Sequence, residues 1–164
     1  MRKYTYFGDL DQTRWPDPSE LKPYFLDPTG DAWPHEGGND SWGLRVTGLN
    51  GTQDLPDESD QVNVYLYMTG YPDLGVHFTY GKWDGRTKEK LDYQSEGNLQ
   101  KEREIVYSMH GTPMSAGSFV PFSDAYKVVK EFIETDGALP SSIKWGRGPD
   151  IPREAWFYPR MERW

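Results

Sequence analysis

The densest group of charged side chains in this sequence is a short acidic run between two apolar stretches. Four carboxylates fall within seven residues, at Asp54, Asp57, Glu58 and Asp60. Carboxylates at this density can hold a calcium ion or pair with the lysine and arginine side chains of a basic partner. The run lacks the glycine and the terminal glutamate of an EF-hand loop. Calcium binding is therefore the lesser option, and the two main interpretations are a solvated hairpin loop and a negative surface that enters the cationic cleft of a partner.

Signatures of catalysis are missing from the rest of the sequence. There is no cysteine, no nucleophile elbow, no P-loop and no glycine-rich dinucleotide loop. His35, His77 and His110 lie far apart without the spacing of a metal site, and we expect each to be an ordinary surface or boundary residue. A glycosidase needs only two carboxylates, but no pair stands out among 26 acidic residues. The sequence therefore predicts a protein that is not an enzyme and holds no metal or cofactor.

Aromatic side chains are the other candidates for recognition chemistry. The chain has seven Trp, eleven Tyr and seven Phe, more than a single core of this size usually holds, so some should be exposed. Trp42 is interpreted as core, whereas Trp33 and Trp83 lie in polar, glycine-containing segments and are predicted to be exposed anchors. The predicted partner-binding residues are Trp33, Asp54, Asp57, Glu58, Asp60 and Trp83.

The negative charge of the chain is concentrated in its N-terminal third. The formal net charge is −8, and residues 1–60 contain twelve acidic and five basic residues. Such a field repels nucleic acid and attracts a basic protein. Solubility is the simpler explanation of an acidic composition, and a cationic partner is the functional one.

The elements that must position these residues include a clear antiparallel hairpin. Residues 62–68 and 74–80 alternate apolar and polar side chains around a Gly-Tyr-Pro-Asp turn, which is typical of two paired strands. Residues 42–47 alternate in the same way and predict another strand. Residues 82–103 are polar and predict a long loop or an exposed strand pair, and 105–109 predict a further strand.

One amphipathic helix is predicted after these strands. Apolar residues recur at helical spacing from Ala125 to Ile133, and Ser123 is expected to cap the first turn. Asp136-Gly137 is typical of a helix end at which glycine adopts a left-handed conformation. A weaker helix is predicted from Pro18. The fold class is therefore α+β: an antiparallel β-sheet on which one long C-terminal helix and a short N-terminal helix pack.

The length of 164 residues predicts a single domain over residues 1–164. Residues 1–60 form its acidic, loop-rich part, and residues 146–164 form an aromatic tail expected to pack along the body or join the partner surface. No apolar run follows the first residues, and none reaches the roughly 20 residues that span a bilayer. Together with the missing cysteines, this predicts a cytoplasmic protein without a membrane partner.

Three segments carry a resemblance to a known family. They are the hairpin NVYLYM…LGVHFTYG, the strand EIVYSMH and the run FVPFSDAYKVVKEFIETDGALPSSIKW. From about Val62 to Trp145, the chain resembles immunity protein family one of bacterial polymorphic toxin systems. The matching residues are mainly structural: Pro121, Phe132, Gly137, Pro140 and Trp145.

The resemblance implies a non-catalytic inhibitor that binds a cognate secreted toxin domain, often a nucleic-acid deaminase or nuclease. An acidic inhibitor suits such a toxin, because it can mimic phosphate charge in a basic cleft. The aromatic content leaves a carbohydrate-binding or carbohydrate-active domain as an alternative. A general protein-interaction module without a toxin is a further one.

Overall fold

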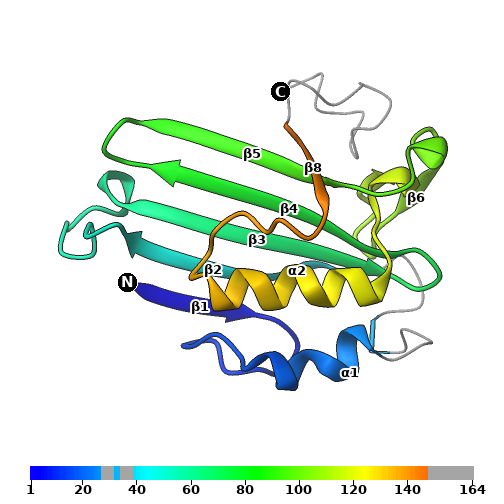
Figure 1. Cartoon of the computed structure of the whole chain (residues 1–164), viewed down its shortest axis with the longest axis horizontal. Coiled ribbons are helices and arrows are strands. Elements are labelled where there is room, and N and C mark those ends of the chain that lie inside the picture. Colours follow the sequence, from blue (N-terminus) through cyan, green and yellow to red (C-terminus); the bar gives the residue numbers. More distant parts are fainter. Residues whose placement is uncertain (27–31, 34–38, 148–164) are drawn as a thin grey trace.

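The computed structural model describes residues 1–26, 32–33 and 39–147, and its centre is a six-stranded antiparallel sheet (Figure 1). The strand order is β1-β2-β3-β4-β5-β8, and the helix α2 lies across one face of the sheet. The predicted α+β class is confirmed. The elements are β1 Arg2–Tyr6, a 3₁₀ turn Pro18–Leu21, α1 Lys22–Phe25, β2 Asn39–Leu49, a 3₁₀ turn Glu58–Asp60, β3 Val62–Tyr71, β4 Gly75–Asp84, β5 Glu89–Glu96, a 3₁₀ turn Leu99–Lys101, β6 Ile105–Tyr107, β7 Pro113–Ser115, a 3₁₀ turn Ala116–Ser118, α2 Phe122–Glu134 and β8 Lys144–Arg147.

The hairpin of β3 and β4 is the centre of this sheet, as its alternating sequence predicts. Leu66 pairs with Tyr80 and Met68 with Phe78, and all four side chains are buried on the face that carries α2. Alternate residues of β3 point to the opposite face, where Tyr67 is 41% exposed. Each large apolar side chain buried here stabilises the fold by roughly 1.5–3 kcal/mol.

The outer strands refine the prediction. Of the two alternatives for residues 82–103, the exposed strand pair is correct, because β4 continues to Asp84 and pairs with β5. The strand β1 is not predicted from sequence; it lies at the edge of the sheet and pairs with β2. Its Thr5 is fully buried, and the Thr5 hydroxyl donates to the Arg14 carbonyl. A buried threonine between charged and aromatic residues explains why this strand lacks an apolar alternation.

The helix α2 begins before the predicted cap. Ser123 lies inside the first turn, and the N-cap position belongs to Pro121, whose carbonyl accepts the first helical hydrogen bond from Ala125 N at 2.9 Å. The physical reason is that Val120 still pairs with Val76 in an extended bridge, so the chain can turn into a helix immediately afterwards. The predicted helix end is confirmed: Asp136 and Gly137 both have positive φ, and Gly137 N donates to Phe132 O at 2.9 Å.

The N-terminal segment completes the core instead of lying on it as loops. Phe7, Leu21 and Phe25 are at most 2% exposed. The Trp15 ring lies 5.0 Å from the ring of Phe132, so the segment and α2 share one apolar layer. Figure 1 shows this segment beside α2, on the same side of the sheet.

The opposite face of the sheet is covered at one end by residues 97–118, which include a separate two-stranded sheet of β6 and β7. The predicted strand at 105–109 is shorter than expected, because β6 ends at Tyr107. The expectation that His77 is a surface or boundary residue is wrong: it is 3% exposed beneath this segment. His110 is exposed as expected, and His35 lies outside the described residues.

Predictions about residues 148–164, which form most of the aromatic tail, lie outside the described residues. In the part of the chain that the structure describes, no helix has the length and apolar character to cross a membrane.

Candidate protein-binding surface

The face of the sheet opposite α2 carries a band of tyrosines between the two ends of the strands. Register places Tyr4, Arg45 and Tyr65 side by side on β1, β2 and β3. Two residues further along β1, Tyr6 is aligned through Gly43 of β2 with Tyr67 of β3, and both tyrosines are 41% exposed. Tyrosine combines an apolar ring with a hydrogen-bonding tip, and it is enriched in protein interfaces. We call Tyr4, Tyr6, Tyr65 and Tyr67 the tyrosine face.

Glycines on neighbouring strands let two of these rings lie flat on the sheet. A Cβ at Gly43 would stand 2.3 Å from the Tyr67 ring, and a Cβ at Gly81 would stand 2.1 Å from the Tyr65 ring. The two tyrosine rings stack at 4.6 Å with an angle of 22° between their planes. The Tyr65 hydroxyl then reaches across β4 and donates to Asp92 Oδ1 at 3.1 Å. The face is therefore ordered before any partner arrives, which lowers the entropic cost of binding.

The acidic turn, residues 54–60, borders the tyrosine face at one end of the strands. Asp57 caps the 3₁₀ turn by accepting from Ser59 N at 2.8 Å, and this hydrogen bond lowers the pKa of Asp57. Glu58 pairs with Arg45 at 2.7 Å, and Asp60 pairs with Lys88 at 2.7 Å. Two of the four carboxylates are thus already balanced, one by a cation of β2 and one by a cation of the β4–β5 turn, and residues 54–60 are less negative than their sequence suggests.

Asp54 lies on the other side of the same turn. It lines an open polar hollow of 630 Å³ together with Glu58, Gln61 and Arg2. The Gln61 side chain is 8% exposed and donates to Leu55 O at 2.8 Å, which holds the loop closed beneath the hollow.

Trp83 supports the acidic turn from β4. Its Nε1 donates to Ser59 O at 2.8 Å, and Lys88 Nζ donates to the same carbonyl at 3.1 Å. A Cβ at Gly85 would stand 2.3 Å from the carbonyl carbon of Asp60, so the β4–β5 hairpin touches the turn directly. Trp83 is half-buried by this packing and is not the fully exposed anchor that the sequence predicts.

The structure therefore brings together five of the six predicted partner-binding residues and separates the sixth. The acidic turn and Trp83 form one contiguous surface. The prediction that Trp33 is an exposed anchor is wrong: it is 1% exposed, and its Nε1 donates to Tyr24 O at 2.7 Å. A Cβ at Gly70 would stand 2.0 Å from the Trp33 ring, so this ring is packed against the sheet backbone. The role of the other five residues in partner binding stays a prediction.

The tyrosine face itself is absent from the sequence-based set. The alternation of β3 does place Tyr65 and Tyr67 on its polar side, but the strand that supplies Tyr4 and Tyr6 is not predicted. The described tryptophans are all buried or half-buried, so the exposed rings are tyrosines. Most of the aromatic surplus that suggests a carbohydrate site is explained by the core.

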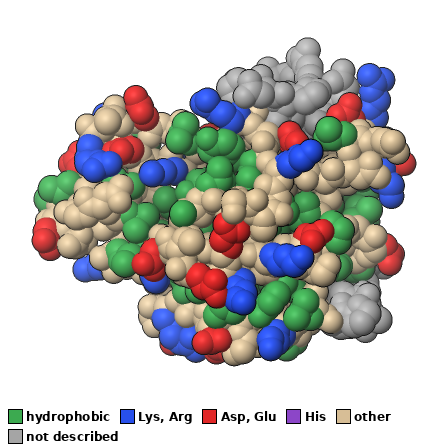
Figure 2. Space-filling view, viewed as in Figure 1, with side chains coloured by type: hydrophobic (Ala, Val, Ile, Leu, Met, Phe, Trp, Pro, Cys, Tyr) green, Lys and Arg blue, Asp and Glu red, His purple; other side chains and the backbone are tan. Residues whose placement is uncertain are grey.

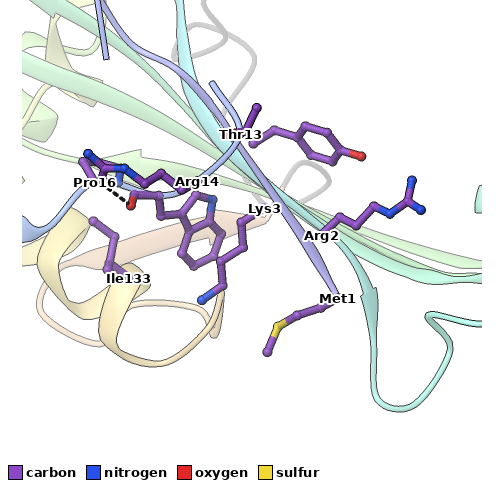
Figure 3. Close-up of a pocket in the computed structure, with 9 residues that line it drawn as sticks. Met1, Arg2, Lys3, Thr13, Arg14, Pro16 and Ile133 are labelled. Atoms are coloured by element: carbon purple, nitrogen blue, oxygen red, sulfur yellow. Dashed lines mark hydrogen bonds between the residues drawn. The ribbon is translucent and has the colours of Figure 1, made fainter. Parts of the chain in front are cut away.

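Two other described surfaces differ from the tyrosine face in character. At the edge of β1, an 820 Å³ hollow is lined by Arg2, Lys3, Arg14 and Trp15 among others (Figure 3). Lys3 lies 4.6 Å above the Trp15 ring and pairs with Asp136, and Arg14 pairs with Glu20, so these two cations are already engaged. The face that carries α2 shows acidic and basic side chains interspersed (Figure 2). Among the described residues, no group of three potential metal ligands converges.

Comparison with known proteins yields one finding. The sequence model of the family Immunity protein Imm1 matches residues 26–147, which is well over half of the chain. The match starts well before Val62 and includes every element from β2 to β8. The family similarity therefore extends into the N-terminal part, where the three recognised segments do not reach. No curated protein and no solved structure gives a significant match.

Proposed function

The chain belongs to the Imm1 family of immunity proteins, and we propose that it protects its producer by binding one cognate toxin domain stoichiometrically and blocking it. The family match is the observation that carries this proposal. It supports a non-enzymatic inhibitor. On this basis we place the protein in the cytoplasm, in a polymorphic toxin system used in bacterial competition.

The toxin domain is proposed to act on nucleic acid, as a deaminase or a nuclease. Such an enzyme needs a basic cleft, and a protein with a formal net charge of −8 is attracted to it over long range. Long-range attraction raises the association rate more than the affinity, so we expect the net charge to speed complex formation and to contribute little to the stability of the complex.

The tyrosine face and the acidic turn are proposed as the contact surface. Interfaces obtain most of their affinity from a few well-packed aromatic and arginine side chains near the centre. Tyr6 and Tyr67 are exposed rings at such a centre, and the carboxylates lie at its rim. The ordered rings supply affinity, and the rim charges supply attraction and orientation.

Co-expression with the toxin domain encoded beside the gene tests the proposal. The wild-type protein should restore growth and co-purify with the toxin in a one-to-one complex. A variant with Tyr6→Ala and Tyr67→Ala should remain folded and lose rescue, whereas Asp73→Asn, in the β3–β4 turn, serves as the surface control, because asparagine tolerates the positive φ of this position. Absence of both complex and rescue for the wild type would reject the proposal. Turnover of a small molecule by the purified chain would contradict the non-enzymatic role.

A further inference from the structure

Residues 97–118 lie at the end of the sheet opposite the acidic turn (Figure 1), and several of their large apolar side chains are exposed. The most exposed of them are Leu99 at 55%, Ile105 at 39%, Tyr107 at 57% and Met109 at 50%. Ile105 and Tyr107 lie on one side of β6, while Met114 of β7, paired with Val106, is buried at 3%. The small β6–β7 sheet thus has one side against the body and one side in solvent.

In the part of the chain that the structure describes, β6 pairs with β7 alone and its other edge is open. Ala116 N donates to Glu104 O, and Ser108 N donates to Thr112 O, so the even-numbered residues face β7. Hydrogen-bonded and non-hydrogen-bonded pairs alternate in an antiparallel ladder, so the N–H and C=O groups of Ile105 and Tyr107 point away from β7. Pro113, which has no N–H, pairs with Tyr107 at a position that needs none. Among the described residues, these outward groups have no hydrogen-bond partner.

A buried polar network fixes this exposed edge in place. Ser115 Oγ donates to Glu102 O at 2.6 Å, and Ser118 Oγ donates to Ser115 O at 2.7 Å. Ser95 on β5 donates to Ser118 O at 2.7 Å, and His77 on β4 contacts Ser118 Oγ at 2.8 Å. The segment is therefore bonded to two strands of the main sheet, and β6 is presented rigidly.

Close backbone contacts add to this anchoring. A Cβ at Gly97 would stand 1.9 Å from Phe119 O, and a Cβ at Gly117 would stand 2.7 Å from Glu102 Cα. Gly97 N also donates to Gly117 O at 2.9 Å. A free edge held this firmly is an ordered template for another strand, and because β6 has three residues it can pair with a short segment only.

We propose that β6 is a docking strand, on which an extended segment of the toxin chain pairs as a third strand of the β6–β7 sheet. The unpaired amides require backbone donors and acceptors, which an extended peptide supplies and a side-chain surface does not. Ile105 and Tyr107 give such a segment two apolar contacts on one side. Because β6 and the acidic turn lie at opposite ends of the main sheet, the docked segment is a part of the toxin outside the region bound at the turn. This inference rests on the proposed function.

Hydrogen exchange of the full chain, free and with the toxin domain encoded beside the gene, tests this pairing. The amides of Ile105 and Tyr107 should exchange quickly in the free protein and at least tenfold more slowly in the complex. Unchanged exchange at both amides in a stable complex would overturn the inference and leave the proposed function standing. Concentration-dependent protection in the free protein would assign the edge to a second copy and would also overturn it. If the wild type forms no complex, it is the proposed function that fails.

A pair of variants isolates the backbone contribution. Ile105→Ala removes most of the side chain and keeps the backbone N–H. Ile105→Pro removes the isoleucine side chain and also the N–H. Neither variant removes a group that forms a hydrogen bond between β6 and β7. Since one hydrogen bond contributes about 1 kcal/mol, Ile105→Pro should bind the toxin about fivefold more weakly than Ile105→Ala. Equal affinities for two folded variants would contradict strand pairing. If Ile105→Pro does not fold, exchange of the wild type decides the question.

Discussion

The two faces of the central sheet are built from the same strands, but one is buried and the other is partly exposed to solvent. On the face that carries α2, Leu66, Met68 and Phe78 are at most 1% exposed. On the other face, one residue further along β3, Tyr67 is 41% exposed and lies over a glycine. Burial of side chains on the first face stabilises the fold, whereas the second face exposes ordered aromatic rings to solvent.

Two tyrosines, Tyr80 and Tyr65, show how the environments of the two faces differ. Tyr80 lies on the helix side, is 4% exposed, and donates its hydroxyl to Gly137 O at 2.8 Å. Burial raises the pKa of Tyr80 to about 12. Tyr65 lies on the open side and donates to Asp92, a side chain at the surface. The same residue type thus closes the core in one place and shapes a surface in the other.

The largest effect is expected on the helix side. Phe132→Ala should lower the free energy of unfolding by about 3–5 kcal/mol, because the ring is fully buried against Trp15 and Tyr80 and leaves a cavity. Tyr67→Ala should change it by about 1 kcal/mol or less. Chemical denaturation of both variants measures the contrast. Similar losses for both would show that the two faces contribute equally to stability and would contradict the comparison.

The buried side chain of His77, beneath residues 97–118, should make the stability of the fold depend on pH. Burial lowers the pKa of His77 from 6.5 to about 3, so as the pH falls below 6.5 the unfolded chain takes up the proton and the folded protein does not. Stability should therefore be unaffected by His77 above pH 6.5 and fall by about 1.4 kcal/mol per pH unit below it, or about 3 kcal/mol by pH 4.

Denaturation curves from pH 7 to pH 4 measure this slope against two variants. His77→Asn should lose much of the decline, since the amide can still donate to Ser118 but does not titrate. His110→Asn, at an exposed histidine, should follow the wild type. A wild-type slope that persists in His77→Asn would assign the acid sensitivity to carboxylates.

A change beneath the tyrosine face should separate binding from stability. Gly81→Ala places a methyl group where the Tyr65 ring lies, so the ring must lift and lose its bond to Asp92. We expect toxin affinity to fall about tenfold, or about 1.4 kcal/mol, with a smaller change in unfolding free energy. Tyr65→Phe, which keeps the ring on Gly81, is the matched control. Calorimetry that finds full affinity for Gly81→Ala would remove the tyrosine face from the interface.

The smallest effect is expected from the acidic turn. Replacing Asp54, Asp57, Glu58 and Asp60 by their amides should slow toxin association several-fold and weaken its salt dependence. The effect is limited because Arg45 and Lys88 already balance two of these charges. Stopped-flow rates at several salt concentrations measure it. An equal loss from neutralising Asp11, Asp73, Asp124 and Glu134 would show that only total charge matters.

Elements with a regular apolar period were predictable from sequence. The alternation around Leu66 and the helical stripe through Phe132 each define a buried face, because a side chain's direction follows from its place in a strand or helix. The prediction that Ser123 caps the helix is wrong, because the bridge between Val120 and Val76 ends the extended segment two residues earlier than local preferences suggest.

The candidate surface was predictable only in part. The acidic turn and Trp83 are near one another in space, because the β4–β5 hairpin returns to the start of β3. The predictions for Trp33 and His77 are wrong, because a glycine-containing segment and the polar side of a strand are both taken as exposed, whereas in the fold each residue is covered. Trp33 packs over Gly70, and His77 lies beneath the segment fixed by Ser118.

The sequence by itself determined the fold class, the central hairpin, and the helix and its end, since all of these follow from local periodicity and turn chemistry. Only the tertiary structure decided which aromatic rings are buried, which carboxylates are balanced, and that β6 keeps an open edge. Those properties depend on contacts between residues far apart in the chain, such as Arg45 with Glu58 and Tyr65 with Asp92. No local pattern encodes such contacts, because burial and pairing are properties of the packed molecule.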